Sequence, residues 1–196
     1  MKTHTTLSLK MIAFAFLISI TSLSCDNPAD DDDAGEQEFI TKVTLRLEEQ
    51  GSTNVVSIIW SDPDGDGRGD FVGTASLKAN KTYKGSIELL NELADKPEER
   101  DITKEILEES DEHQFFYTFS SSLRPFATVT ITDKDKNNLP VGLQFDVVTT
   151  ALPSGTASQS GTLNIVLSHY STIKKAGTNP GNEEDVNITA PVSLSN

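Results

Sequence analysis

The residues best able to do chemistry lie in a short acidic loop, which spans residues 62–70 (DPDGDGRGD). Carboxylates occupy its positions one, three, five and nine: Asp62, Asp64, Asp66 and Asp70. A hard dication such as Ca²⁺ needs several oxygen ligands on a tightly curled chain. The alternate aspartates supply those oxygens, and Gly67 at position six permits the bend. The spacing therefore predicts a calcium site.

This spacing resembles the Asp-rich calcium loops of EF-hand, dockerin and thrombospondin-type repeats. Position twelve is Gly73 rather than a bidentate glutamate, and no helices are expected on either side. The loop is therefore expected to belong to a hairpin that bound calcium stabilises, rather than to a calcium sensor. The alternative is a tight Asp/Gly turn that joins two strands without metal. Four close carboxylates repel one another unless a cation is present, so both interpretations stay open.

A second group combines acidic residues with histidine. Residues 105–113 carry five carboxylates and end at His113, and His169 is the only other histidine beyond residue 24. If the stretch is helical, Glu109 and His113 share a face. Glu109, His113 and His169 could then bind Zn²⁺ or a similar metal through nitrogen and oxygen. The alternative is a solvated acidic helix end followed by a strand, with both histidines near a sheet edge.

Other catalytic patterns are missing from the sequence. It has no Gly-x-Ser-x-Gly elbow, phosphate loop or dinucleotide fingerprint. No pair of carboxylates stands in an apolar setting that would raise one pKa for glycoside hydrolysis. A non-enzymatic protein is therefore expected, with no catalytic residues.

The first 38 residues predict export and lipid attachment. Lys2 and Lys10 flank the start of an apolar run at 11–20, which ends shortly before Cys25, the only cysteine. The run is too short to span a bilayer permanently. We expect a lipoprotein signal peptide at 1–24 and lipidation of Cys25. The alternative is an ordinary secretory signal that is cut near residue 24.

An acidic segment, 25–38, follows the cysteine and includes four successive aspartates at 30–33. Such a segment cannot bury apolar surface, so it is expected to be a flexible tether. It resembles the acidic export tethers of Bacteroidetes-type lipoproteins, which implies the outer membrane and the cell surface, with the periplasmic face as the alternative. Removal of residues 1–24 leaves a formal charge of about −16, which excludes nucleic acid as a partner.

From residue 39 onward, apolar residues recur at every second position, which is the period of a β-strand. The pattern predicts one domain, 39–196, built as a single antiparallel β-sandwich, Ig-like or partly closed as a barrel, with eight or nine strands. Residues 71–77 are expected to form one strand, 102–112 a short helix or a pair of turns, 133–140 a turn, and 174–185 a loop before the last strand.

Four blocks together resemble a known family; they span residues 64–67, 108–117, 139–145 and 161–169. They are similar to short lipoproteins of Bacteroidetes-type genomes that are often labelled type 1 periplasmic binding fold superfamily proteins. A type 1 periplasmic binding protein is a larger, two-lobed α/β structure, so the strand alternation decides the fold expected here. Family members are often encoded near TonB-dependent outer-membrane receptors, which implies an accessory role in capturing a nutrient or metal.

The sequence thus leads to two expectations of function. The first is a surface-anchored, non-enzymatic lipoprotein that binds a ligand or metal for a TonB-dependent transporter. The second is a structural or adhesive surface module that calcium stiffens. The first requires His113 and His169 to lie together with acidic partners, whereas the second leaves them far apart.

Overall fold

The computed structural model describes residues 38–173, 175–181 and 183–196. Cys25, the expected signal peptide and all of the expected tether except Glu38 lie outside these residues. These residues form ten strands in two sheets, one α-helix and one 3-10 helix at Pro97–Glu99, so the expectation of a mainly β sandwich or partly closed barrel is confirmed. Within the described ranges, no helix combines the length and the apolar character needed to cross a bilayer.

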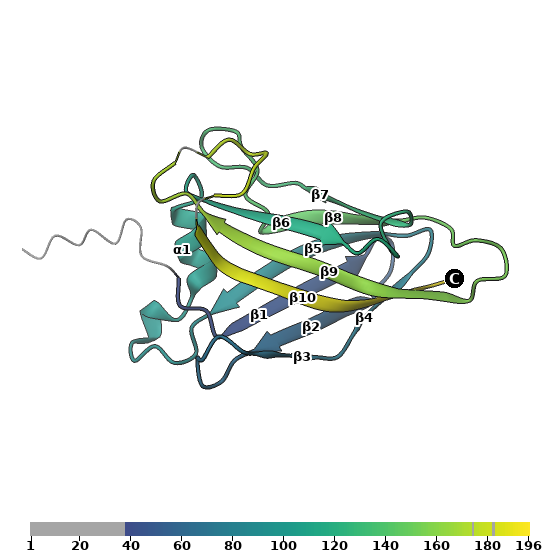
Figure 1. The fold of residues 1–196 in the computed structure, drawn as a ribbon, viewed down its shortest axis with the longest axis horizontal. Helices are drawn as coiled ribbons and strands as arrows, with labels where there is room; N and C mark the ends of the chain where they lie inside the picture. The colour runs from purple at the N-terminus through teal and green to yellow at the C-terminus, as the bar shows by residue number, and fades with distance from the viewer. Residues whose placement is uncertain (1–37, 174, 182) are drawn as a thin grey trace, which may run out of the picture. The chain divides into compact units, whose positions relative to one another are not determined.

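The larger sheet is antiparallel and has the strand order β3-β2-β1-β5-β8-β7 (Figure 1). Its strands are β1 (Lys42–Glu49), β2 (Val55–Ser61), β3 (Asp70–Val72), β5 (Thr82–Leu90), β7 (Ala127–Ile131) and β8 (Gln144–Thr149). The smaller sheet has the order β4-β10-β9-β6, and β4 runs parallel to β10. Its strands are β4 (Ala75–Lys78), β6 (His113–Phe119), β9 (Ser158–His169) and β10 (Glu183–Ser195).

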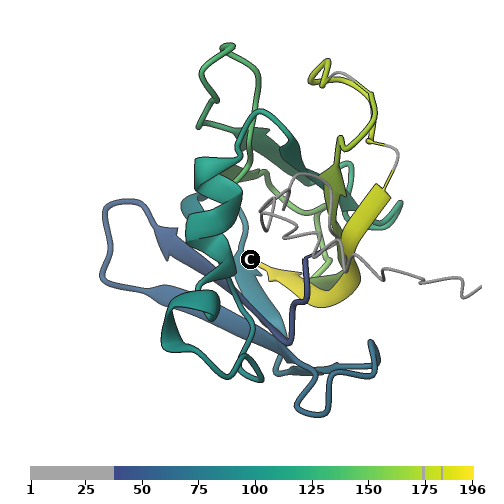
Figure 2. The same ribbon diagram turned by 90° about the vertical axis from the view of Figure 1, so that its left-hand side faces the viewer.

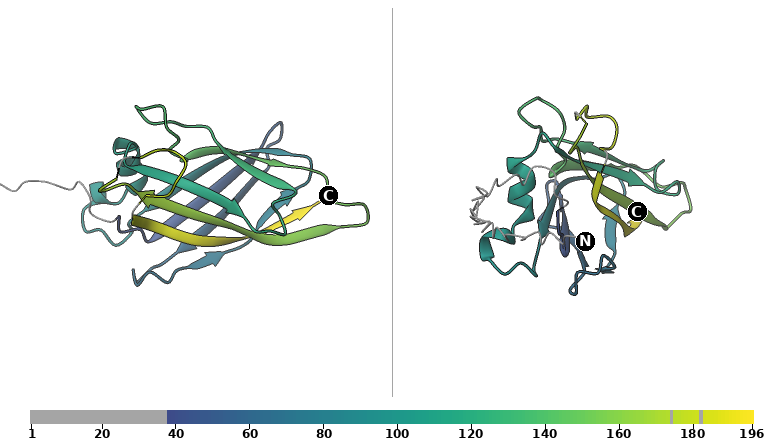
Figure 3. Two further views of the ribbon diagram at one scale, coloured as in Figure 1. Left: turned by 45° about the horizontal axis from the view of Figure 1, so that its top comes forward. Right: turned by 60° about the vertical axis from the view of Figure 1, so that its left-hand side comes forward.

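The core lies between the two sheets, which face each other in Figure 3. On β1 the buried apolar residues are Val43, Leu45 and Leu47, and on β9 they include Ile165 and Leu167. Successive side chains of a strand point to opposite faces, so this alternation places one apolar row of each strand inside. Burial of each such side chain stabilises the fold by about 1.5 to 3 kcal/mol.

The expectation of a single strand over 71–77 is wrong. The chain breaks there into β3, which pairs with β2, and β4, which pairs with β10 in the other sheet. Gly73 lies between them with φ of 92°, a conformation that a residue with a side chain rarely adopts. The glycine therefore lets the chain cross from one sheet to the other, and the strand count rises to ten.

Helix α1 (Ile102–Glu108) ends four residues earlier than expected. Its first turn is capped by Asp101, whose side chain accepts a hydrogen bond from the Lys104 N–H at 3.2 Å. Ile102 and Ile106 are buried, and α1 lies across one end of the sheets in Figure 2. After Glu109 the chain turns directly into β6, which makes His113 the first residue of a strand.

Candidate metal centre

Strand pairing brings the two histidines together. In the antiparallel register of β6 and β9, His113 lies directly opposite His169. The two imidazole rings stack with their centroids 4.4 Å apart and their planes at 25°. Both side chains are buried, with exposed fractions of 0% and 1%. β6 is the edge strand of its sheet, as the alternative interpretation expected, but the histidines point into the protein rather than into solvent.

A β-bulge adds Asp185 to this pair. β10 pairs with β9, and the register shifts between Glu184 and Val186. A bulge re-aims side chains, so the side chain of Asp185 is buried next to the buried Val186, although the residue as a whole is only partly buried. Its Oδ2 lies 3.6 Å from His113 Nε2, and its Oδ1 lies 3.9 Å from His169 Nδ1. The sequence analysis had assigned this aspartate to a loop, and the start of β10 at Glu183 shows that this was wrong.

Two glutamates border the three residues. Glu38 Oε1 lies 4.0 Å from His113 Nε2, and the Glu38 backbone N–H donates to Asp185 Oδ1 at 3.3 Å. Glu109 contributes its backbone carbonyl, which lies 3.3 Å from His113 Nδ1. Glu38, Glu109 and His113 can each place one ligand atom within 4.8 Å of the others, as can His113, His169 and Asp185. The predicted residues Glu109, His113 and His169 therefore lie at one place.

The Glu109 carbonyl determines which nitrogen of His113 carries the proton. Because a carbonyl can only accept, Nδ1 is the protonated nitrogen, and the lone pair lies on Nε2. That lone pair faces the carboxylates of Asp185 and Glu38. A histidine that ligates a metal through one nitrogen usually donates its other N–H to a carbonyl or carboxylate in this way.

Four atoms of the cluster are buried without a hydrogen-bond partner among the described residues. They are His113 Nε2, Asp185 Oδ2 and both ring nitrogens of His169. A buried polar group without a partner costs about 1 to 3 kcal/mol. Four such atoms at one place indicate that something else, whether a proton, a water molecule or a cation, belongs among them.

Burial drives both titrating groups toward their neutral forms. Burial lowers the pKa of His113 to about 4, and the neighbouring His169 lowers it further. Burial also raises the pKa of Asp185 to about 6, although His169 opposes this shift. At neutral pH His113 is therefore an uncharged imidazole, which is the form that binds metals.

The geometry suits a small divalent ion. Zinc binds nitrogen and oxygen ligands at about 2.0 to 2.2 Å, so the ligand atoms of a tetrahedral site lie about 3.3 to 3.5 Å apart. In this cluster His113 Nε2 lies 3.6 Å from Asp185 Oδ2 and 4.0 Å from Glu38 Oε1, and His169 Nδ1 lies 3.9 Å from the other Asp185 oxygen, Oδ1. One ligand atom from each of His113, His169 and Asp185 lies within 4.8 Å of the others, so the side chains would have to draw closer to reach the distances of a zinc site.

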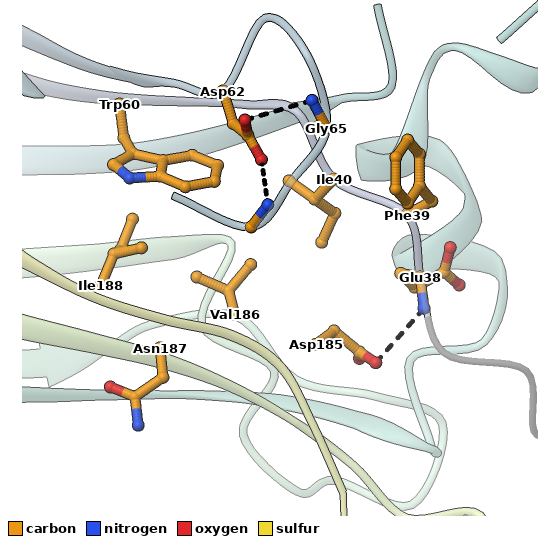
Figure 4. A pocket seen from close by; sticks show the side chains of 11 residues that line it. Glu38, Phe39, Ile40, Trp60, Asp62, Gly65, Asp185, Val186, Asn187 and Ile188 are labelled. Atoms are coloured by element: carbon orange, nitrogen blue, oxygen red, sulfur yellow. Dashed lines mark hydrogen bonds between the residues drawn. The ribbon is translucent and has the colours of Figure 1, made fainter. Parts of the chain in front are cut away.

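The Asp-rich loop forms a separate group between β2 and β3. Asp62 is buried, and its carboxylate accepts hydrogen bonds from the N–H groups of Gly65 at 3.2 Å and Gly67 at 2.7 Å (Figure 4). Asp62, Asp64 and Asp66 can place ligand atoms within 4.8 Å of one another. Asp70 is not part of that group; it begins β3, opposite Ser61. The structure thus brings three of the four predicted calcium ligands together.

A pocket of about 250 Å³ separates the two candidate sites. One wall is the Asp-rich loop with Asp62, and the other is β10 with Asp185 and Val186. Figure 4 shows the apolar side chains of Trp60 and Ile40 between them. Both acidic groups therefore border one solvent-connected space.

The loop after β9 fixes the strand end that carries His169. Lys175 is buried there, where its Nζ donates to the Ser110 carbonyl at 2.7 Å and to Asp135 Oδ2 at 3.0 Å. Gly181 packs directly on the backbone of His169, since a Cβ at this glycine would lie 2.0 Å from the His169 carbonyl oxygen. The positions of the histidine rings thus depend on loop contacts as well as on strand pairing.

Sequence analysis missed two members of the cluster, Glu38 and Asp185. The first stands at the end of an acidic run, and the second follows two glutamates, so neither differs from its neighbours in the sequence. The only available signal was the position of Asp185 immediately before the alternating residues of the last strand. Comparison of the chain with protein-family models, with curated proteins and with solved structures gave no match.

Proposed function

We propose that the protein is an exported, lipid-anchored metal-binding protein that holds one divalent transition-metal ion between His113, His169 and Asp185. The observation that carries this proposal is the buried group of ring nitrogens and a carboxylate oxygen that lack hydrogen-bond partners among the described residues. One ion binds an imidazole through only one nitrogen, so a bound cation would satisfy His113 Nε2, Asp185 Oδ2 and one of the two His169 nitrogens at once.

The donor set supports zinc or a metal of similar preference. Two imidazoles and a carboxylate suit Zn²⁺, Fe²⁺ or Ni²⁺, whereas Ca²⁺ and Mg²⁺ prefer oxygen ligands alone. Cu⁺ prefers sulfur, and residues 38–196 contain neither cysteine nor methionine. Zinc is therefore the first metal to test at this site.

Burial of the ligands supports a holding role rather than catalysis. The side chains of His113, His169 and Asp185 have exposed fractions of 1% or less. A catalytic metal needs a position open to water or substrate. We therefore propose that the protein is not an enzyme.

Location and partner rest on the sequence. The signal-like segment, Cys25 and the acidic tether support attachment to the outer membrane, with the cell surface as the proposed side and the periplasmic face as the alternative. The resemblance to short lipoproteins supports a TonB-dependent receptor as the partner that would receive or supply the ion. Lipid analysis of Cys25 and co-purification with membrane proteins test these two points.

A calcium-stiffened surface module is the second candidate. The observation that favours it is the grouping of the Asp62, Asp64 and Asp66 carboxylates within 4.8 Å. Asp62 already accepts two backbone hydrogen bonds, so the loop also has a metal-free explanation. The two candidate functions differ in the metal and in the residues that bind it.

The decisive experiment is titration of the metal-free protein with Zn²⁺ and, separately, with Ca²⁺. We expect one zinc ion per chain, and loss of zinc binding in His169→Gln and His113→Gln. Glu184→Gln is the matched control, because it removes an exposed charge next to Asp185. Zinc binding that is absent in the wild type, or unchanged in both histidine variants, would contradict the proposal.

A further inference from the structure

Glu38 touches the metal cluster twice, although it lies four residues before β1, in the other sheet. Its backbone N–H donates to Asp185, and its side-chain Oε1 lies 4.0 Å from His113 Nε2. The Glu38 side chain is only 11% exposed, which is unusual for a glutamate in a segment without regular structure. The Glu38 carboxylate thus stands next to the cluster in a setting where it has lost most of its hydration.

Charge balance gives this carboxylate a role at the proposed metal site. Two neutral imidazoles and the Asp185 carboxylate leave one positive charge of a divalent ion uncompensated. A second carboxylate neutralises the site and fills the fourth position of a tetrahedron. Glu38 is placed for this role because its Oε1 and Asp185 Oδ2 both face the same nitrogen, His113 Nε2. Glu109 can also place a carboxylate oxygen within 4.8 Å of Glu38 and His113, and its backbone carbonyl orients the His113 ring; Glu38 differs in that its backbone N–H also contacts Asp185.

We propose that Glu38 is the fourth ligand of the ion. The bound ion would then link the chain that leads into β1 to the strands of the smaller sheet. The inference rests on the proposed metal site. Beyond Glu38, Ile40 is buried, and Thr41 is held by its backbone bond to the Leu90 carbonyl at 3.0 Å. The ion thus fastens the stretch 38–39, which comes just before the part already held by the larger sheet.

This arrangement connects metal loading with the tether. Glu38 is the last residue of the expected tether, 25–38, so the same side chain would belong to both the anchor segment and the metal site. When the ion is bound, Glu38, where the tether ends, is held to the smaller sheet. When the ion leaves, residues 38 and 39 lose that attachment.

The test compares the full-chain wild type with Glu38→Ala, using Zn²⁺ as the probe and a competing chelator to measure affinity. Both proteins should bind one zinc ion, and the Kd of the variant should rise at least tenfold, in the range seen when supporting groups of metal sites are removed. Glu38→Gln should show a smaller rise, because an amide oxygen can still bind weakly. Glu184→Gln should bind as the wild type does.

Hydrogen exchange provides a second measurement. Zinc should slow amide exchange at residues 38–41 in the wild type and leave it unchanged in Glu38→Ala, whose metal-free fold is checked by circular dichroism. Equal zinc affinity of the wild type and Glu38→Ala, or no effect of zinc on exchange at 38–41 in the wild type, would overturn the fourth-ligand role while the three-residue site stands. Failure of the wild type to bind zinc would overturn both proposals.

Discussion

His113 and Asp185 face each other as two buried groups whose charged forms are both unfavourable. The folded-state pKa of His113 is about 4, below its ordinary value of 6.5. Between pH 4 and pH 6.5, therefore, this histidine binds a proton in the unfolded chain but not in the folded chain. This contribution makes the metal-free protein more stable as the pH rises through that window. The folded-state pKa of Asp185, about 6, lies above its ordinary 3.8, so its contribution has the opposite sign and falls as the pH rises to about 6.

Asp185→Asn separates these two effects. The amide cannot titrate, but its N–H can donate to His113 Nε2, as a protonated Asp185 would. We therefore expect a difference in the free energy of unfolding, variant minus wild type, that increases with pH. Between about pH 4 and pH 6 it should rise by at most about 1.4 kcal/mol per pH unit, and above pH 6 it should level off. Urea denaturation of both metal-free proteins across this range measures the difference.

Above about pH 6, Asp185→Asn should be more stable than the wild type without metal, yet it should no longer bind zinc tightly. Glu184→Gln serves as the control because its side chain is exposed, and its difference from the wild type should stay nearly flat over the same range. A flat difference for Asp185→Asn would mean that Asp185 titrates normally and that the cluster is more hydrated than its geometry indicates.

At the scale of elements, the loop after β9 is held by a buried ion pair. Burial works to raise the pKa of Asp135, but hydrogen bonds from Leu139 and Lys175 outweigh it and hold the pKa below the ordinary value. Burial lowers the pKa of Lys175, although Asp135 opposes the shift. Asp135 Oδ1 also accepts from the N–H groups of Asn137 and Leu139, so this carboxylate joins a turn and a loop.

Lys175→Met should be costly because it leaves the buried Asp135 charge without its partner. We expect a loss of about 3 kcal/mol in the free energy of unfolding. Adding Asp135→Asn should recover part of that loss, since the amide oxygen can still accept the two backbone hydrogen bonds of the turn. A double-mutant cycle in urea measures the coupling, with the exposed pair of Lys96 and Glu99 as a control that should couple weakly. Additive effects at 135 and 175 would show that the pair is not coupled.

Most of the strands could be predicted because apolar residues recur at every second position of the sequence, and these are the positions whose side chains are buried. Ile102 and Ile106 likewise predicted the inner face of the helix. The break at Gly73 could not be predicted, since a glycine inside an alternating run is also compatible with a continuous strand. Asp185 was missed because a bulge displaces it from the regular alternation, and a bulge depends on how two strands pair rather than on either sequence alone.

At the scale of the whole molecule, the strongly negative chain attracts cations generally, so specific binding has to be separated from screening. If the Asp-rich loop binds calcium, saturating Ca²⁺ should raise the melting temperature, and at a hundred times Kd it would add about 2.7 kcal/mol. An Asp64→Asn, Asp66→Asn double variant should lose this gain and keep its zinc binding. The same rise in melting temperature with Mg²⁺, or in the double variant, would assign the effect to screening.

The position of β10 in the sheet has a consequence for when the site can exist. β10 follows every other described strand in the chain, yet it lies inside the smaller sheet, and Asp185 contacts a residue 147 positions earlier. Contacts between residues so far apart form late, because the loop between them has to close first. Under the proposal that a signal peptide directs export, a chain that crosses the inner membrane unfolded would bring these residues together only after translocation. The proposed ion would then be acquired in the compartment where the protein folds.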